Sequence, residues 1–267
     1  MNMSAIRRTF LLSAFSLVLG TGLVTQAVAG EQLATIKKNG TLNVGLEGTY
    51  PPFSFVGEDG KLTGFEVEFS EALAKELGVK VKLSATPWAG ILAALESKRL
   101  DVVINQVTIS DERKKKYDFS EPYTVSGIQA LVRTKDAGVI KTAADLKGKK
   151  VGVGLGTNYE EWLKANVPDA IVKTYDDDPT KYQDLRVGRI DAILVDRLAA
   201  LELVAKTKDK DELAVSGEPF SRQEAGIALR KGEPELLDAI NKAIDKLRAD
   251  GTLAKLSQKY FKADVTK

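Results

Sequence analysis

The sequence predicts an α/β protein of two lobes, each a mixed β-sheet flanked by helices, with two extended hinge crossings between them. Segments with strand and helix patterns alternate along the chain, which is typical of mostly parallel sheets covered by helices. The alternation runs through two cycles whose sequences echo each other. In both cycles an apolar strand ends in polar residues. These observations together predict the two-lobed arrangement.

The first cycle begins with an apolar strand and a helix whose apolar residues recur every four positions. Phe69, Leu73 and Leu77 form that stripe, and Gly78 ends the helix. A strand with alternating lysines follows, then a helix opened by Pro87 and a buried strand. The predicted strands are 42–46, 79–83 and 101–105, and the predicted helices are 66–77 and 87–99.

The second cycle starts after Thr124 and repeats the alternation. Asp196 follows its last strand, where a carboxylate can cap the next helix. Two further helices, separated by Gly251, lie near the C-terminus. The predicted strands are 150–155, 171–175 and 191–195, and the predicted helices are 159–165, 179–187, 234–249 and 252–260.

The two cycles share two short sequence patterns. VGLEGTY at 44–50 matches VGLGTNY at 153–159, and RLDVVINQ at 99–106 matches RIDAILVD at 189–196. Ligands of open α/β sheets bind beyond the carboxyl ends of strands. Two facing sheets would therefore surround one cleft with polar strand ends. The alternative is that any two strand–helix units with an Arg-Leu/Ile-Asp turn look alike, and the pattern alone leaves both readings open.

We expect the chain to cross between the lobes near 126–129 and again near 224–226. The first lobe would then comprise residues 30–126 and 224–267, so that the two C-terminal helices return to it. The second lobe would comprise residues 127–223. No Pro- or Ser-rich linker separates the cycles, which is why we place both crossings in extended segments.

The first 29 residues have the features of a secretory signal peptide. Arg7 and Arg8 precede an apolar run from Phe10 to Val24, and Ala27-Val28-Ala29 suits cleavage before Gly30. A permanent membrane anchor is the alternative, but the run is interrupted by Ser, Gly and Thr and is short for a span of about 20 apolar residues. The Arg pair also faintly resembles a twin-arginine signal.

Composition excludes several classes of function. Without residues 1–29 the chain loses two Arg and no acid, so the net charge of +2 becomes zero. That balance removes the electrostatic argument for binding nucleic acid or an anionic membrane. The chain has no His and no Cys, which excludes Ser-His-Asp and Cys-His catalysis and the common zinc sites. We expect a free protein in the periplasm with no metal, cofactor or catalytic residues.

The stretch from Asn105 to Arg113 is the richest in polar groups. It leaves a buried strand and enters a helix whose first turn carries Arg113. A guanidinium can bind a carboxylate through two parallel hydrogen bonds. The alternative is that Arg113 joins Lys114, Lys115 and Lys116 in a solvated run of charge, and the residues alone leave this open.

Other candidates lie at strand ends and tight turns. Gly152–Asn158 lacks the third Gly of a dinucleotide-binding turn and the Lys of a P-loop, but such a turn before a helix can present N–H groups to a carboxylate. Asp196 could pair with an ammonium or only cap a helix. Tyr50 and Trp88 could wall an apolar pocket or belong to the core. The acidic loop 176–178 reads as a solvated turn and helix cap, with calcium as a minor alternative.

These stretches together resemble the family-3 bacterial extracellular solute-binding proteins, which deliver polar amino acids to ABC transporters. The resemblance covers residues 36–265 and rests on TYPPFSF, LTGFEVEF, SKRLDVVINQVTISDERKKKYDFSEPY, GKKVGVGLGTN, RIDAILVD and RADGTLAKLSQKYF. Three stretches, GLEGTYPPFSF, VINQVTISDERKKKYDF and KKVGVGLGTNYEEWL, look like the members that bind L-cystine. The resemblance implies a two-lobed type II periplasmic-binding-protein fold and a monomer that binds an amino acid and docks on an inner-membrane permease.

The resemblance also implies roles for individual residues. Arg113 would bind the ligand α-carboxylate and Asp196 the α-ammonium. Six other positions would complete the site: Tyr50, Trp88, Gln106, Thr108, Thr157 and Asn158, with Glu47 at the cleft edge. The alternatives are another polar amino acid, such as glutamine, arginine or glutamate, or a dehydratase of cyclic dienyl acids on the same scaffold with Glu47 as general acid.

Overall fold

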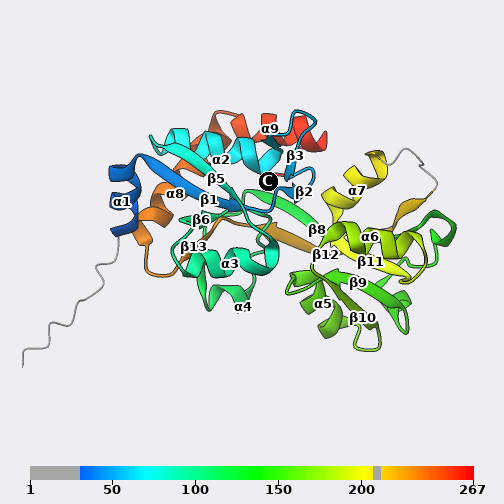
Figure 1. Cartoon of the computed structure of the whole chain (residues 1–267). Helices are drawn as coiled ribbons and strands as arrows, with labels where there is room; N and C mark the ends of the chain where they lie inside the picture. Colours follow the sequence, from blue (N-terminus) through cyan, green and yellow to red (C-terminus); the bar gives the residue numbers. More distant parts are fainter. Residues whose placement is uncertain (1–30, 207–211) are drawn as a thin grey trace, which may run out of the picture.

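The computed structural model describes residues 31–206 and 212–267, so the expected signal peptide lies outside the described residues. Within them, no helix combines the length and the apolar character needed to cross a bilayer. Two five-stranded sheets form the framework, and Figure 1 shows them side by side with helices around each. The predicted α/β fold with two mixed sheets is confirmed.

The first sheet has the strand order β5-β1-β6-β13-β7. β1 runs parallel to β5 and β6, whereas β13 runs antiparallel to β6 and β7. Helices α1, α2, α3, α4, α8 and α9 belong with this sheet (Figure 1). The elements are β1 (Thr41–Leu46), β5 (Lys80–Ala85), β6 (Val102–Val103), β7 (Tyr117–Phe119), β13 (Ala228–Arg230), α1 (Glu31–Asn39), α2 (Phe65–Glu76), α3 (Trp88–Glu96), α4 (Asp111–Lys114), α8 (Pro234–Ala249) and α9 (Thr252–Phe261).

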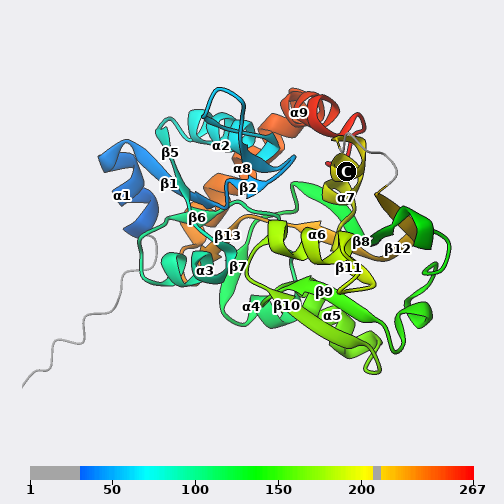
Figure 2. The same ribbon diagram turned by 45° about the vertical axis from the view of Figure 1, so that its right-hand side comes forward.

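The second sheet has the order β10-β9-β11-β8-β12. β9 runs parallel to β10 and β11, and β8 runs antiparallel to both β11 and β12. Helices α5, α6 and α7 cover it (Figures 1 and 2). The elements are β8 (Thr124–Arg133), β9 (Lys150–Gly154), β10 (Ile171–Tyr175), β11 (Ala192–Asp196), β12 (Leu213–Ala225), α5 (Asn158–Asn166), α6 (Asp178–Arg186) and α7 (Arg197–Lys206).

The two extended crossings are the long strands β8 and β12, which pair with each other from Thr124↔Ala225 onward. Figure 1 shows them running from the first sheet toward the second. The predicted extended crossings are therefore present as paired strands, while the lobe borders given above remain a prediction. Sequence patterns missed α1 and a small antiparallel sheet of β2 (Thr49–Tyr50), β3 (Ser54–Val56) and β4 (Leu62–Thr63).

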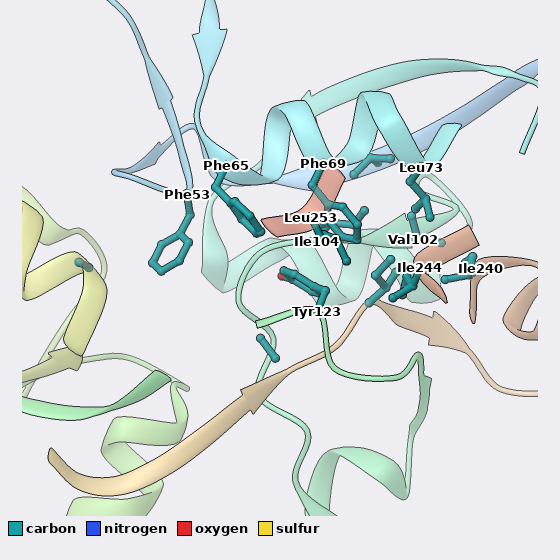
Figure 3. Close-up of a cluster of buried hydrophobic side chains, with 14 of the residues drawn as sticks. Phe53, Phe65, Phe69, Leu73, Val102, Ile104, Tyr123, Ile240, Ile244 and Leu253 are labelled. Carbon is teal, nitrogen blue, oxygen red and sulfur yellow. The ribbon is translucent and has the colours of Figure 1, made fainter. Parts of the chain in front are cut away.

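An aromatic cluster fixes α2 on the first sheet. Phe65 and Phe69 lie one turn apart on α2 and are fully buried, because an apolar residue at every fourth position faces one side of a helix. Phe69 stacks on Tyr123 with ring centroids 4.9 Å apart. Figure 3 shows both phenylalanines beside Tyr123, Ile244 and Leu253. The C-terminal helices α8 and α9, which carry Ile244 and Leu253, thus pack against α2.

The sequence echo between the two cycles has a structural counterpart. Asp101 accepts a hydrogen bond from the N–H of Asn43 at 2.8 Å, and Asp191 accepts one from the N–H of Lys150 at 2.8 Å. Each aspartate thus ties the strand it precedes to the strand beside it. The repeated Arg-Leu/Ile-Asp turn therefore joins two neighbouring strands in the same way in both sheets. Residues at or just after the carboxyl ends of β1, β6, β9 and β11 gather in one region, which contains Glu47, Asn105, Gly154 and Val195.

Candidate functional site

A cavity of about 320 Å³ lies between the strand ends of the two sheets. Its wall includes five of the predicted site residues: Tyr50, Trp88, Gln106, Thr157 and Asn158. Thr108, Arg113 and Asp196 do not line it, but they lie buried beside residues that do. The cavity also takes in Glu47, Asn105, Tyr159, Tyr175, Lys181 and the acidic loop 176–178.

Arg113 is buried, unlike the lysines that follow it. Its exposed fraction is 7%, whereas Lys114, Lys115 and Lys116 are all exposed. Ser110 caps α4 by accepting the N–H of Arg113, which sets the guanidinium on the inner side of that first turn. Nη1 donates to the carbonyl of Thr108 at 3.3 Å, and the buried Nη2 has no acceptor. The solvated-run alternative is therefore wrong for Arg113.

Trp88 connects Arg113 to the cavity. The guanidinium carbon lies 5.2 Å from the centre of the indole ring, a cation–π arrangement. The indole N–H also reaches the carbonyl of Gly156 at 3.4 Å, so a residue of α3 contacts the turn after β9. Burial lowers the pKa of Arg113, and an anion placed at Nη2 would offset that cost of burying the guanidinium.

Asp196 ends β11 and is 3% exposed. Its Oδ1 accepts the N–H groups of Leu198 at 2.7 Å and Ala199 at 3.3 Å, so the predicted helix-capping role is present. Burial raises its pKa to about 6, against the lowering effect of Ser126 and of those two N–H groups. A cation beside this carboxylate would compensate its burial, so capping and ammonium binding are compatible at one side chain.

Tyr159 is a central residue that sequence reasoning did not select. It is 9% exposed and lines the cavity. Its hydroxyl lies 3.4 Å from that of Tyr50, which joins the two sides of the cavity. The charges of Asp196 and Arg113 both act on its phenol, with burial the main reason that its pKa is raised. The signal was available, because Tyr50 and Tyr159 end the two matching patterns VGLEGTY and VGLGTNY.

The side chain of Gln106 is hydrogen-bonded to other residues of the protein. Its backbone N–H donates to the buried Glu66 at 2.6 Å, and its side-chain amide donates to the same oxygen at 3.2 Å. Its side-chain oxygen accepts the hydroxyl of Thr124, the first residue of β8, at 3.0 Å. Burial raises the pKa of Glu66 to about 7. Gln106 thus links the cavity wall to the start of a crossing strand.

The turn after β9 is already hydrogen-bonded. The N–H groups of Leu155, Gly156 and Thr157 reach the carbonyl of Tyr175, the carboxylate of Glu160 and the carbonyl of Gly154. The hydroxyl of Thr157 caps α5 and also donates to Gly154. The expectation that this turn presents free N–H groups to a carboxylate is therefore wrong at these three positions, because the neighbouring strand, the side chain of Glu160 and the turn itself already accept them.

The acidic loop is an exposed turn at Asp176 and Asp177, as expected. Asp177 does cap α6, accepting the N–H of Thr180 at 2.8 Å. However, Asp176, Asp177 and Asp178 all line the cavity, and Asp178 pairs with the buried Lys181 at 2.6 Å. No group of acidic, His or Cys side chains in the described part of the chain gathers in a way that could hold a metal ion.

Glu47 stands on the opposite wall at the end of β1. Its carboxylate accepts the side-chain N–H of Asn105 at 2.7 Å, and its own N–H donates to Asn105 at 2.8 Å. Burial raises its pKa, Asp178 raises it further and Lys181 lowers it. Glu47 and the loop of α6 therefore share one electrostatic environment across the cavity.

Comparison with known proteins agrees with this geometry. The chain is 66% identical to the L-cystine-binding protein TcyJ of Escherichia coli K12 over the full length of both. The structure resembles an ancestral arginine-binding protein bound to arginine, with a TM-score of 0.79 and 44% identity over 83% of this chain and 98% of that one. It also resembles an ancestral amino acid-binding protein described as a precursor of cyclohexadienyl dehydratase (TM-score 0.78, 41% identity, covering 86% and 98%).

The family model for bacterial extracellular solute-binding proteins, family 3, matches residues 42–263. That match spans both sheets and every residue of the cavity wall. The two-lobed fold and the resemblance seen in the sequence are thus confirmed. The chain belongs to the bacterial extracellular solute-binding proteins of family 3.

Proposed function

We propose that this protein binds L-cystine between its two lobes and delivers it to the permease of an amino-acid ABC transporter. Arg113 holds the α-carboxylate of the ligand, and Asp196 holds its α-ammonium. Tyr50 and Trp88 pack on the ligand, while Gln106, Thr108, Thr157 and Asn158 complete the wall. The full-length identity of 66% to a protein that binds L-cystine supports this ligand.

The observation that carries the proposal is the buried Nη2 of Arg113, which has no acceptor. An unpaired buried donor on a charged group costs roughly 1–3 kcal/mol or more. A ligand carboxylate at that nitrogen would remove this cost and make a charge-assisted bond. Asp196 is also buried and has a raised pKa. An ammonium beside it would stabilise its ionised form. A zwitterion satisfies both groups at once, which a singly charged solute does not.

The same two residues give a reason for the lobes to close. Arg113 comes from α4 beside the first sheet and Asp196 from the end of β11 in the second. Both charges of the ligand are paired at the same time only when the two lobes lie close together around it. Bending of β8 and β12 at the lobe borders, near 126–129 and 224–226, would produce that hinge motion. The closed monomer is then the form that a permease in the inner membrane recognises.

The test is calorimetry on protein that has been unfolded and refolded to remove any ligand carried through purification. L-cystine should bind with a dissociation constant of about 1 μM, since charge-assisted bonds and aromatic contact together supply roughly −8 kcal/mol. L-arginine, L-glutamine and L-glutamate, which are smaller and carry one amino-acid end, serve as competitors. Binding of any of these with no binding of L-cystine would refute the proposed ligand.

The protein acts by binding and does not turn its ligand over. The resemblance to the precursor of a cyclic dienyl acid dehydratase gives the one enzymatic alternative, with Glu47 as general acid because its pKa is raised. Prolonged incubation with cyclic dienyl acids, followed by mass analysis of the products, distinguishes a binding protein from such an enzyme. Loss of water together with carbon dioxide from the acid, beyond the rate without protein, would establish the enzyme. The export signal at 1–29 and the periplasmic location are tested by the N-terminal sequence of the secreted protein, expected to begin at Gly30.

A further inference from the structure

A second charged group lines the cavity away from Arg113 and Asp196. Among the described wall residues, Lys181 is the one cation, and it is 3% exposed. Its Nζ pairs with Asp178 Oδ1 at 2.6 Å and lies 5.5 Å from the centre of the Tyr182 ring. Asp178 also accepts the hydroxyl of Tyr182 at 3.0 Å. The pair with Asp178 offsets the cost of burying this lysine, and both members of the pair line the cavity.

Lys181 and Asp178 share the cavity with the tyrosine pair, Tyr50 and Tyr159. The phenols of Tyr50 and Tyr159 are each acted on by the charges of both Asp196 and Asp178. Glu47, from the opposite wall, is in turn acted on by Asp178 and Lys181. Tyr50, Tyr159 and Glu47 line the same cavity as Asp178 and Lys181, so the charged pair faces the space that a ligand beside the tyrosines would occupy.

We propose that Lys181 and Asp178 form a distal subsite that binds the second amino-acid end of a two-ended zwitterionic ligand. Lys181 Nζ donates to the distal carboxylate. Asp178, with Glu47 across the cavity, accepts from the distal ammonium. This inference rests on the proposed function, because it assigns the second end of the ligand proposed there.

The geometry also predicts which ligands the subsite rejects. A distal end that is only cationic, as in L-arginine, would meet the ammonium of Lys181 as well as the carboxylates. A distal zwitterion pairs with both signs. Lys181 should therefore favour a two-ended zwitterion over a basic amino acid of similar length, by adding a repulsive contact to the wrong ligand.

The experiment compares L-cystine with S-(methylthio)-L-cysteine, which keeps the disulfide but replaces the distal amino-acid end by a methyl group. Calorimetry is done on the wild-type protein, on Lys181→Met and on Asp178→Asn. We expect each variant to bind L-cystine at least tenfold more weakly, while affinity for the truncated ligand changes less than twofold. Lys181→Met should also bind L-arginine more tightly than the wild type does. Lys164→Met, an exposed lysine of α5, is the matched control.

The possible results separate this inference from the proposed function. If the wild type binds both ligands equally, the cystine site stands and the distal subsite is wrong. An equal loss for both ligands in the two variants would mean that the Lys181–Asp178 pair only supports α6, which also overturns the subsite. If the wild type binds neither ligand, the proposed function fails and the subsite fails with it. Thermal melting of each variant identifies a loss that comes from unfolding.

Discussion

The hydroxyls of Tyr50 and Tyr159 lie 3.4 Å apart, one from β2 beside the first sheet and one from α5 on the second. They are the last residues of the two matching sequence patterns. Tyr159 is buried and Tyr50 half-buried, and the charge of Asp196 acts on both phenols. The contact therefore marks where the two sides of the cavity meet, next to the proposed ammonium site.

Removing the Tyr159 hydroxyl should weaken ligand binding modestly. Tyr159→Phe loses one hydrogen-bonding group worth about 0.5–1.5 kcal/mol, so the dissociation constant should rise by roughly two- to tenfold. Calorimetry with L-cystine measures it. Tyr260→Phe, which removes a hydroxyl bound to Glu68 on the outer side of α2, should leave affinity unchanged. Equal affinity in Tyr159→Phe and the wild type would mean that this phenol takes no part in binding.

Arg113→Ala and Asp196→Ala should each weaken binding at least a hundredfold. Each variant leaves one charge of a buried zwitterion without its partner, which costs several kcal/mol. Lys114→Ala, a change at the exposed neighbour of Arg113, should bind as the wild type does. Circular dichroism should show both variants folded. Near-native affinity in either variant would remove that residue from the site.

Affinity should fall as the pH drops below about 6. In the ligand-free protein burial raises the pKa of Asp196 to about 6, and only its ionised form attracts an ammonium. Below this pKa the carboxyl must first release a proton, so the dissociation constant should rise toward tenfold per pH unit. Near pH 7 affinity should be flat, and it should begin to fall near pH 8, where the α-ammonium of the ligand loses its proton.

Calorimetry between pH 4.5 and 8 measures this dependence, and Asp196→Asn provides the comparison. The variant should bind weakly with no step near pH 6. A wild-type affinity that is the same at pH 5 and pH 7 would contradict the assignment of the ammonium to Asp196.

Gly64 tests the placement of α2. It precedes the helix with φ +125°, and an added Cβ would lie 2.3 Å from the carbonyl oxygen of Phe53. Gly64→Ala should therefore lower the free energy of unfolding by about 2 kcal/mol or more. Gly90, inside α3, has open space around its Cβ position, so Gly90→Ala should raise stability by roughly 0.4–1 kcal/mol. Urea unfolding compares both with the wild type, and an unchanged Gly64→Ala would contradict the described turn.

Much of the fold could be predicted from periodicity and strand ends. The stripe of Phe69, Leu73 and Leu77 located α2 to within one residue at each end. The strand predicted at 101–105 was wrong in length, since only Val102–Val103 pairs as a strand. Beyond Val103 the chain turns toward the cavity. The side-chain amide of Asn105 donates a hydrogen bond to Glu47, and that of Gln106 donates one to Glu66. Such long-range partners leave no periodic signal.

The site itself was harder to predict from the residues. Burial separates Arg113 from three adjacent lysines, and the sequence shows only a run of four cations. Lys181 and Asp178 were not selected from the sequence, because an oppositely charged pair at positions i and i+3 near the start of a helix is usually a solvated ion pair. Only the packing of α6 against the cavity distinguishes it.

The most direct test of the account is a crystal structure of the protein grown with L-cystine. The account predicts one α-carboxylate within about 3.2 Å of Arg113 Nη2 and the α-ammonium of the same end at a similar distance from Asp196. The ligand would then contact residues of both sheets. A ligand bound to one lobe only, with Arg113 turned to solvent and Asp196 remote from any ligand nitrogen, would contradict it.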